Sequence, residues 1–290
     1  MADRGGYLRI GELARRTGVK PDLLRAWEQR YGLLQPSRSE GGFRLYTDLD
    51  ERRVRRTAEL ISGGLSAGEA ARMALTGDVD SAVRPQDAAQ PLLQDLAGWF
   101  AGALDRLDGE SANATFDALL ATFSVEVVLR DVVLAYLRDL GDRWATGGAS
   151  VAQEHFASNI IRGRLMGLAR GWGAGSGPSV VLACPPGEAH EFGLIIFGIA
   201  VARRGWRVTF LGADTPIASV QDAVRSLQPA LVVLAVSTGE RARAHASSLR
   251  ELASLAPVAL GGAISAEEAA ELGVQLLPGD PIEAARSVAA

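Results

Sequence analysis

The sequence predicts a multidomain protein in which helical segments come first and an alternating α/β segment comes last. Two short helices joined by a glycine-containing turn open the chain and predict a helix-turn-helix domain. Four longer helical stretches in the middle predict a four-helix bundle. In the last third, apolar strands alternate with helices, which predicts a parallel, doubly wound sheet of flavodoxin-like order. We place the three domains at residues 1–76, 90–173 and 177–290.

The composition limits the classes of protein to which this chain can belong. Hydrophobic residues make up 48% of the 290, but no run approaches the ~20 apolar residues of a membrane span, and no signal peptide is visible. The single cysteine, Cys184, excludes an intramolecular disulfide and favours a reduced, cytoplasmic setting. The net charge of −4 is uneven: residues 1–75 hold 14 basic and 10 acidic residues, and the remainder holds 16 and 24. A basic first quarter predicts contact with nucleic acid, although an arginine-rich surface alone would look the same.

The first 75 residues supply the elements of a DNA reader. A helix before Gly18 is followed by a second that starts at Pro21, a residue suited to the first helical position. Leu23, Leu24 and Trp27 are expected to form its buried stripe. Gly41 and Gly42 then predict the tip of a small hairpin. Thr47 and Ser66 are expected to cap two further helices, at 48–62 and 67–75.

This segment resembles the winged-helix DNA-binding domain of the MerR family. The matching residues lie at 10–14, 17–19, 24–28, 30–33 and 42–46. The resemblance implies binding to DNA as a dimer or higher oligomer, with the second helix in the major groove and the wing on phosphates. The DNA contacts that it implies are Arg15, Lys20, Arg25, Arg30, Arg38 and Arg44. Metal-responsive members carry cysteines in a short coiled coil, and this chain has no such cysteine-bearing coiled coil, so we do not expect a metal sensor.

The middle of the chain follows a predicted linker at 76–90, which is rich in Gly, Asp, Ala and Pro. Helices are expected at about 91–107, 111–123, 125–145 and 150–172, with short breaks that imply antiparallel neighbours. Trp144 ends the third helix, and Ser150 caps the fourth, just before Glu154 and His155. The short connection brings these side chains to one end of the bundle. An ordinary core Trp and a polar helix end would account for the same residues.

Strands are predicted in the last third at 179–184, 206–211, 230–236, 257–260 and 273–277, after a second linker at 171–178. His190 follows the first strand, where open α/β sheets bind ligands. Glu188 is positioned to accept a hydrogen bond from one ring nitrogen and leave the other free as a metal ligand. Gly193 removes a side chain where a large flat group would lie against the backbone. A histidine at a helix start is also commonly a cap or a solvated residue.

The loops after the later strands complete the candidate site. Ser237 follows the third strand, and Gly261 and Gly262 follow the fourth, so they are expected to line a deep slot between sheet and helix. The first strand is not followed by a Gly-x-Gly-x-x-Gly turn, and no Walker sequence is present, which disfavours nucleotide sites of those kinds. The third histidine, His245, is expected to lie at a distance from this site.

These loops resemble the cobalamin-binding Rossmann domain of methionine synthase and several mutases, whose signature is Asp-x-His-x-x-Gly, Ser-x-Leu and Gly-Gly. Here Glu188 stands for the Asp, and Gly239 stands for the Leu. Trp144, nine intervening residues and then Glu154-His155 resemble the helical cap of cobalamin-binding photoreceptor regulators. Over the whole chain the resemblance is to CarH/LitR-type regulators: a MerR-like reader, a helical cap and a cobalamin domain.

The resemblance implies roles for the site residues. His190 would ligate cobalt from below, oriented by Glu188, and the displaced base would enter the slot at Ser237, Gly261 and Gly262. Trp144, Glu154 and His155 would cover the upper face beside the adenosyl group. In the family, an adenosylcobalamin-bound tetramer holds operator DNA and represses transcription, and light cleaves the cobalt–carbon bond and disperses the oligomer. The resemblance therefore implies a regulator rather than an enzyme.

One departure from the family keeps alternatives open. Light-sensing members carry a histidine directly after the cap Trp, which takes the upper cobalt position once the adenosyl group leaves. This chain has Ala145 there. A light-independent sensor of cobalamin, a corrinoid carrier that borrowed a helix-turn-helix, and a regulator with an empty Rossmann domain therefore remain as alternatives to a photoreceptor.

Overall fold

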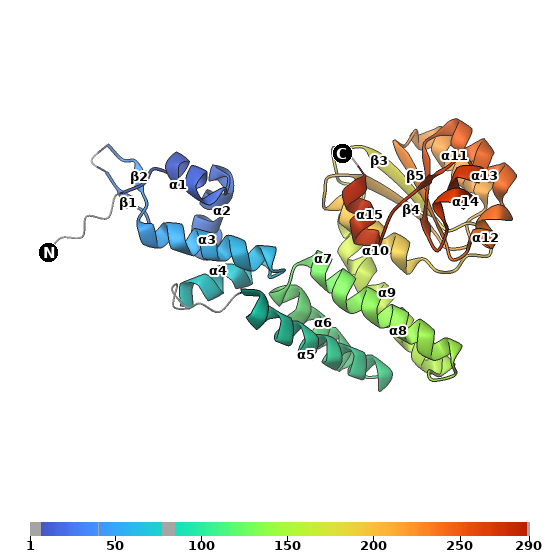
Figure 1. Ribbon diagram of the computed structural model, residues 1–290, viewed down its shortest axis with the longest axis horizontal. Coiled ribbons are helices and arrows are strands. Elements are labelled where there is room, and N and C mark those ends of the chain that lie inside the picture. The colour runs from blue at the N-terminus through green and yellow to red at the C-terminus, as the bar shows by residue number, and fades with distance from the viewer. Residues whose placement is uncertain (1–6, 40, 77–84, 289–290) are drawn as a thin grey trace. The chain divides into compact units, whose positions relative to one another are not determined.

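The computed structural model describes residues 7–39, 41–76 and 85–288 (Figure 1). The chain divides into two compact units, residues 1–132 and 133–290. In the described part of the chain, no helix is both long and apolar enough to cross a membrane.

The first unit opens with the predicted helix-turn-helix. Helix α1 (Ile10–Thr17) ends at Gly18, whose φ of 73° lies in the left-handed region that favours glycine, and α2 (Pro21–Tyr31) begins with proline. Leu24 and Trp27 are buried as predicted, but Leu23 is 46% exposed. The prediction for Leu23 is wrong because each helical residue turns the side chain by roughly 100°, which carries Leu23 out of the stripe that Leu24 and Trp27 share.

The predicted hairpin and the two capped helices follow. Strands β1 (Ser37–Arg38) and β2 (Arg44–Leu45) pair antiparallel. A capping box between Thr47 and Asp50 starts α3 (Asp48–Ser62), and the Ser66 hydroxyl accepts a hydrogen bond from the amide of Glu69 in α4 (Ala67–Thr76). These elements confirm the predicted order of helices and wing.

The middle helices differ from the prediction at their start. Helix α5 (Pro85–Asp105) begins within the expected linker and contains Pro91, while residues 77–84 of that linker lie outside the described residues. The prediction took Pro85 as part of the linker. Proline is well suited to the first position of a helix, and Pro85 is the first residue of α5. Helix α6 (Gly109–Thr122) packs against α5, with the rings of Phe100 and Phe116 centred 5.6 Å apart.

The third predicted helix is built from three pieces: α7 (Val125–Val127), a π-helical segment (Val128–Val133) and α8 (Leu134–Ala145). The fourth is α9 (Val151–Leu168), which a capping box between Ser150 and Gln153 starts, followed by one 3-10 turn (Ala169–Gly171). Because α5 and α6 belong to one compact unit and α8 and α9 to the other, a single four-helix bundle over 90–173 stays a prediction.

The second unit contains the predicted parallel sheet. Its order is β4-β3-β5-β6-β7, which is the flavodoxin-like order expected for five strands. The strands are β3 (Ser179–Ala183), β4 (Arg207–Gly212), β5 (Leu231–Val236), β6 (Val258–Gly262) and β7 (Gln275–Leu276). The first strand of the domain, β3, lies between the second and the third, so the strand order reverses beside it. Ligands of such sheets bind at this reversal.

Helices cover both faces of this sheet (Figure 1). Helix α10 (Phe192–Ala202) packs with α15 (Pro281–Ser287), and α11 (Ile217–Leu227) packs with α13 (Ala246–Leu255). The shorter helices α12 (Gly239–Arg243) and α14 (Ala266–Glu271) follow β5 and β6. The central strands β3, β5 and β6 are mostly buried and almost continuously apolar, whereas β4 and β7 at the edges of the sheet keep exposed residues. This rigid core fixes the strand ends from which the site loops leave.

Candidate functional site

The loop that carries His190 leaves the carboxyl end of β3 and is tied to the loop after β4. The amide of Gly187 donates to Asp214 Oδ1 at 2.7 Å, and the amide of Asp214 donates back to the Glu188 carbonyl at 3.0 Å. The amide of Thr215 donates to the Cys184 carbonyl at 2.8 Å. These reciprocal bonds hold the loop in one conformation before any ligand binds.

Glu188 lies at the centre of the site. Its side chain is 1% exposed, and Oε1 lies 2.5 Å from His190 Nδ1, while Oε2 accepts from the amide of Ser237 at 2.7 Å. Arg241 lies 4.0 Å from Oε2 and also donates to the Gly187 carbonyl. One carboxylate therefore joins the loop after β3 to the loop after β5, across the reversal of strand order.

The charge of Glu188 follows from these contacts. Burial acts to raise the pKa of this carboxyl, but the hydrogen bonds from Ser237 and His190 outweigh it and hold the pKa at about 2. Glu188 is consequently a carboxylate at neutral pH and accepts from Nδ1–H of His190. The His190 side chain is 76% exposed, so Nε2, the nitrogen opposite the one that Glu188 holds, is accessible to a ligand.

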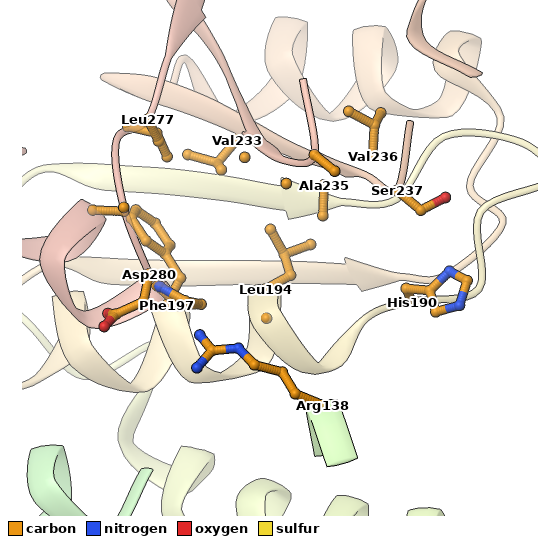
Figure 2. Close-up of a pocket in the computed structure, with 17 residues that line it drawn as sticks. Arg138, His190, Leu194, Phe197, Val233, Ala235, Val236, Ser237, Leu277 and Asp280 are labelled. Atoms are coloured by element: carbon orange, nitrogen blue, oxygen red, sulfur yellow. The ribbon is translucent and has the colours of Figure 1, made fainter. Parts of the chain in front are cut away.

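Below His190, a cavity of about 420 Å³ runs between the sheet and α10 (Figure 2). Figure 2 shows His190 and Ser237 at the ends of neighbouring strands, with Leu194 and Phe197 of α10 along the wall. The predicted residues Gly193, Ser237, Gly261 and Gly262 all line this lower cavity. The structure therefore brings together the slot residues that the sequence indicated.

A second cavity of about 470 Å³, the upper cavity, lies between α8, α9 and the start of α10. Trp144, Glu154 and His155 line it together with His190. Glu154 holds His155 Nδ1 at 2.5 Å and accepts from the Ser158 hydroxyl at 2.8 Å. Trp144 is exposed, so it is a cavity wall and not the ordinary core residue that the alternative reading expected.

The two adjacent glycines of β6 serve different purposes. A Cβ added at Gly261 would meet no atom within 4 Å, so its missing side chain leaves open space in the lower cavity. A Cβ added at Gly262 would lie 2.0 Å from the Val236 carbonyl oxygen, and its φ is 119°. Gly262 is thus required by the backbone of β5, whereas Gly261 keeps the cavity clear.

Sequence reasoning missed two contributors. The first is Arg138, which lines both cavities. Its position could have been predicted from helical spacing, because it lies on the same side of α8 as the other residues that line the upper cavity: Leu134, Leu137, Gly141 and Trp144. His245 was expected at a distance, but its Nε2 lies 3.1 Å from the Pro186 carbonyl oxygen and supports the His190 loop. His245 is not among the described residues that line either cavity, so its contribution is to the loop and not to the cavity walls.

In the first unit, two of the predicted DNA-contacting arginines, Arg15 and Arg25, form exposed ion pairs. Arg15 pairs with Glu12 at 2.6 Å, and Arg25 pairs with Asp22 at 2.6 Å. Such pairs are worth little in water, so phosphates can replace the carboxylates. Lys20, Arg30 and Arg38 are exposed, and none has a side-chain partner among the described residues.

Arg44 is built into the wing. Its Nε lies 2.9 Å from Glu28 Oε1 on α2, and the Tyr46 hydroxyl donates to Glu28 Oε2 at 3.0 Å. Burial, together with the bond to Glu28, raises the pKa of Tyr46 to about 12, so this hydroxyl keeps its proton. Glu28 therefore fixes the wing against the predicted recognition helix.

Comparison with known proteins finds family matches to three segments of the chain. Residues 8–76 match the MerR HTH family of regulatory proteins, and residues 100–166 and 178–285 match two B12 binding domain families. The HTH-type transcriptional repressor CarA of Myxococcus xanthus is 38% identical over 88% of this chain and 86% of its own length. The repressor CarH of the same organism is 33% identical over 91% of this chain and 90% of its own length. This chain belongs to the CarH-type family of MerR regulators with B12-binding domains.

A solved structure supports the fold of the CarH-type chain. The monomethylamine corrinoid protein of Methanosarcina barkeri superposes with a TM-score of 0.54 at 15% identity, over 67% of this chain and 96% of that one. The Glu188–His190 loop and the lower cavity fall within the B12 binding domain match at 178–285.

The structure shows what a side chain at position 239 of this CarH-type chain would meet. A Cβ there would collide with the carboxylate of Glu268, which a capping box with Ser265 holds at the start of α14. A leucine at 239 therefore requires Glu268 to move.

Proposed function

We propose that this chain is a cytoplasmic, non-enzymatic transcriptional repressor that binds adenosylcobalamin, holds operator DNA as an oligomer, and responds to light. One observation carries the proposal: His190 presents an exposed ring between two cavities while the buried Glu188 holds its Nδ1. An imidazole held by a carboxylate through one nitrogen is the usual arrangement of a histidine metal ligand. The relatives CarA and CarH, both named as repressors, support the regulatory half of the proposal.

The residues present fit the cofactor. His190 would ligate cobalt through Nε2, and Gly261, where a Cβ would project into open space, leaves the lower cavity free for the cofactor's base. Trp144, Glu154 and His155 would cover the upper face, and Gly193 would let the ring approach α10. When bound, adenosylcobalamin supplies a cobalt–carbon bond that light cleaves.

Thermodynamic linkage would couple cofactor binding to DNA binding through the oligomeric state. A ligand that binds one assembly better than another shifts the population toward that assembly. The test is titration of the purified chain with adenosylcobalamin in the dark, with absorption, size-exclusion and DNA mobility-shift measurements before and after green light. We expect a corrin spectrum, a dimer or tetramer in the dark, and weaker DNA binding after light. Cofactor binding that changes neither assembly nor DNA affinity would contradict the proposed repressor mechanism.

The wing and the second helix should contribute differently to DNA binding. Removing Arg44 should weaken binding to all sequences and reduce the salt slope by about one, because it removes one phosphate contact. Removing Arg25 should cost more affinity for a selected operator than for random duplex. Arg72→Ala, which breaks an exposed pair with Glu69 on α4, is the matched control. Operator binding that survives loss of both Arg25 and Arg44 would point to another DNA-binding face.

Ala145 bears on the response to light, because it occupies the position where light-sensing members of the family carry a histidine. His155 lines the upper cavity with Trp144 and His190, which supports it as the substitute upper ligand after illumination. We expect a lit product that is less stable than the adduct of family members with a histidine directly after the cap Trp, because either water takes the upper cobalt position or α9 has to shift to bring His155 to it.

Spectra of wild type and His155→Ala after green light measure this. A two-histidine spectrum that the variant loses assigns the upper ligand to His155. The same stable spectrum in both proteins contradicts the assignment, because the remaining histidines are His190 and His245, which is bound to Pro186. A corrin spectrum that light leaves unchanged selects the light-independent sensor.

A further inference from the structure

Arg138 occupies the boundary between the two cavities. It extends from α8 and lines both, a property it shares with His190 and Gly193. Figure 2 shows its guanidinium directed along α10, toward the end of the lower cavity where Phe197 and Asp280 lie. It is the only lysine or arginine among the described residues that line either cavity.

The guanidinium of Arg138 is uncommitted. No hydrogen bond or ion pair to its side chain is present among the described residues, whereas Arg143 on the same helix pairs with Asp139 at 2.7 Å. Asp280, the carboxylate that lines the lower cavity, caps α15 through hydrogen bonds from the amides of Ile282 and Glu283 at 2.7 and 3.0 Å. The surrounding wall is mostly apolar, so a cation here lacks a fixed counter-charge.

We propose that Arg138 binds the phosphate of the cofactor's nucleotide tail, an inference that rests on the proposed cobalamin site. The side chains around the corrin ring are neutral amides, and the phosphodiester that joins the ring to the lower base is the anionic group. With cobalt on His190 and the base in the lower cavity, the phosphate that joins ring and base would lie along this cavity, which Arg138 lines. Arginine suits it because its planar fork donates two parallel hydrogen bonds to a phosphate.

Titration with three adenosyl corrinoids distinguishes phosphate binding by Arg138 from a general contribution of Arg138 to corrinoid binding. Adenosylcobalamin carries the phosphate and the base, adenosylcobinamide phosphate carries a phosphate without the base, and adenosylcobinamide carries neither. Each is titrated in the dark into the full chain as wild type, Arg138→Met, Arg138→Lys and the control Arg143→Met. Arg138 is exposed, so the methionine variant keeps the fold, which thermal unfolding checks.

We expect Arg138→Met to weaken binding of both phosphate-bearing corrinoids by about tenfold or more, since hydrogen bonds to charged groups are the strong ones. Binding of adenosylcobinamide should stay unchanged, Arg138→Lys should recover part of the loss, and Arg143→Met should match wild type. An equal loss for all three corrinoids, or no loss for any, overturns the phosphate assignment while leaving the cobalamin site in place. If wild type binds none of the three, the proposed function itself fails.

Discussion

Replacing His190 with alanine should weaken cobalamin binding by about a hundredfold or more, or leave the cofactor's own base on cobalt. The magnitude follows because loss of a partner that merely orients a metal ligand already costs about 10–100-fold. His190 is the one histidine among the described residues that lines both cavities. Titration with adenosylcobalamin in the dark, followed by absorption, distinguishes cobalt ligated by histidine from cobalt ligated by the base.

A matched variant separates ligation from orientation. Glu188→Gln keeps the size of the side chain but removes the charge that holds Nδ1, so we expect a loss of about tenfold with a histidine-ligated spectrum in the bound fraction. If His190→Ala binds with unchanged affinity and spectrum, the lower ligand is not His190.

Substituting Gly261 with leucine should abolish cobalamin binding and leave the fold intact. Position 261 has space for a Cβ and lies in β6, so the larger side chain enters the lower cavity without a backbone cost. The free energy of unfolding should stay within about 1 kcal/mol of wild type. Chemical denaturation and cofactor titration of the same preparation measure both effects.

The neighbouring glycine provides the contrast. Gly262→Ala should lower the free energy of unfolding by about 3 kcal/mol or more, because the added Cβ meets the Val236 carbonyl at a φ of 119°. A Gly261→Leu protein that still binds cobalamin tightly would mean that the lower cavity does not receive the base. A Gly262→Ala protein as stable as wild type would contradict the close approach of β5 and β6.

Much of this fold was predictable because its signals are local. Gly18 and Pro21 mark a turn and a helix start within four residues of each other, and alternating apolar strands and helices define a parallel sheet. Residues after successive parallel strands meet at one edge of the sheet, which is why the sequence alone predicts that His190, Ser237 and Gly261 line one slot, as they do in the structure.

What escaped prediction depends on contacts between distant segments. The ion pair of Arg44 with Glu28 joins the wing to α2, and nothing in the sequence indicates which acidic residue an arginine of the wing contacts. Arg138 lies on a helix that precedes the sheet, and only tertiary packing brings it beside His190. The π-helical segment at Val128–Val133 replaces part of an expected α-helix, and its apolar residues fit either winding.

The buried cysteine at the end of β3 has a consequence for redox chemistry. Cobalt accepts sulfur as well as nitrogen ligands, and a thiol binds metals and reacts with oxidants as its thiolate. Burial, reinforced by the charges of Glu188 and Glu191, raises the pKa of Cys184 to about 12. At neutral pH this thiol therefore stays protonated, six residues before His190, and neither competes for the metal nor enters the oxidation ladder that begins with a thiolate. Burial is the main cause of this raised pKa, and the Glu188 carboxylate that holds the His190 imidazole adds to it.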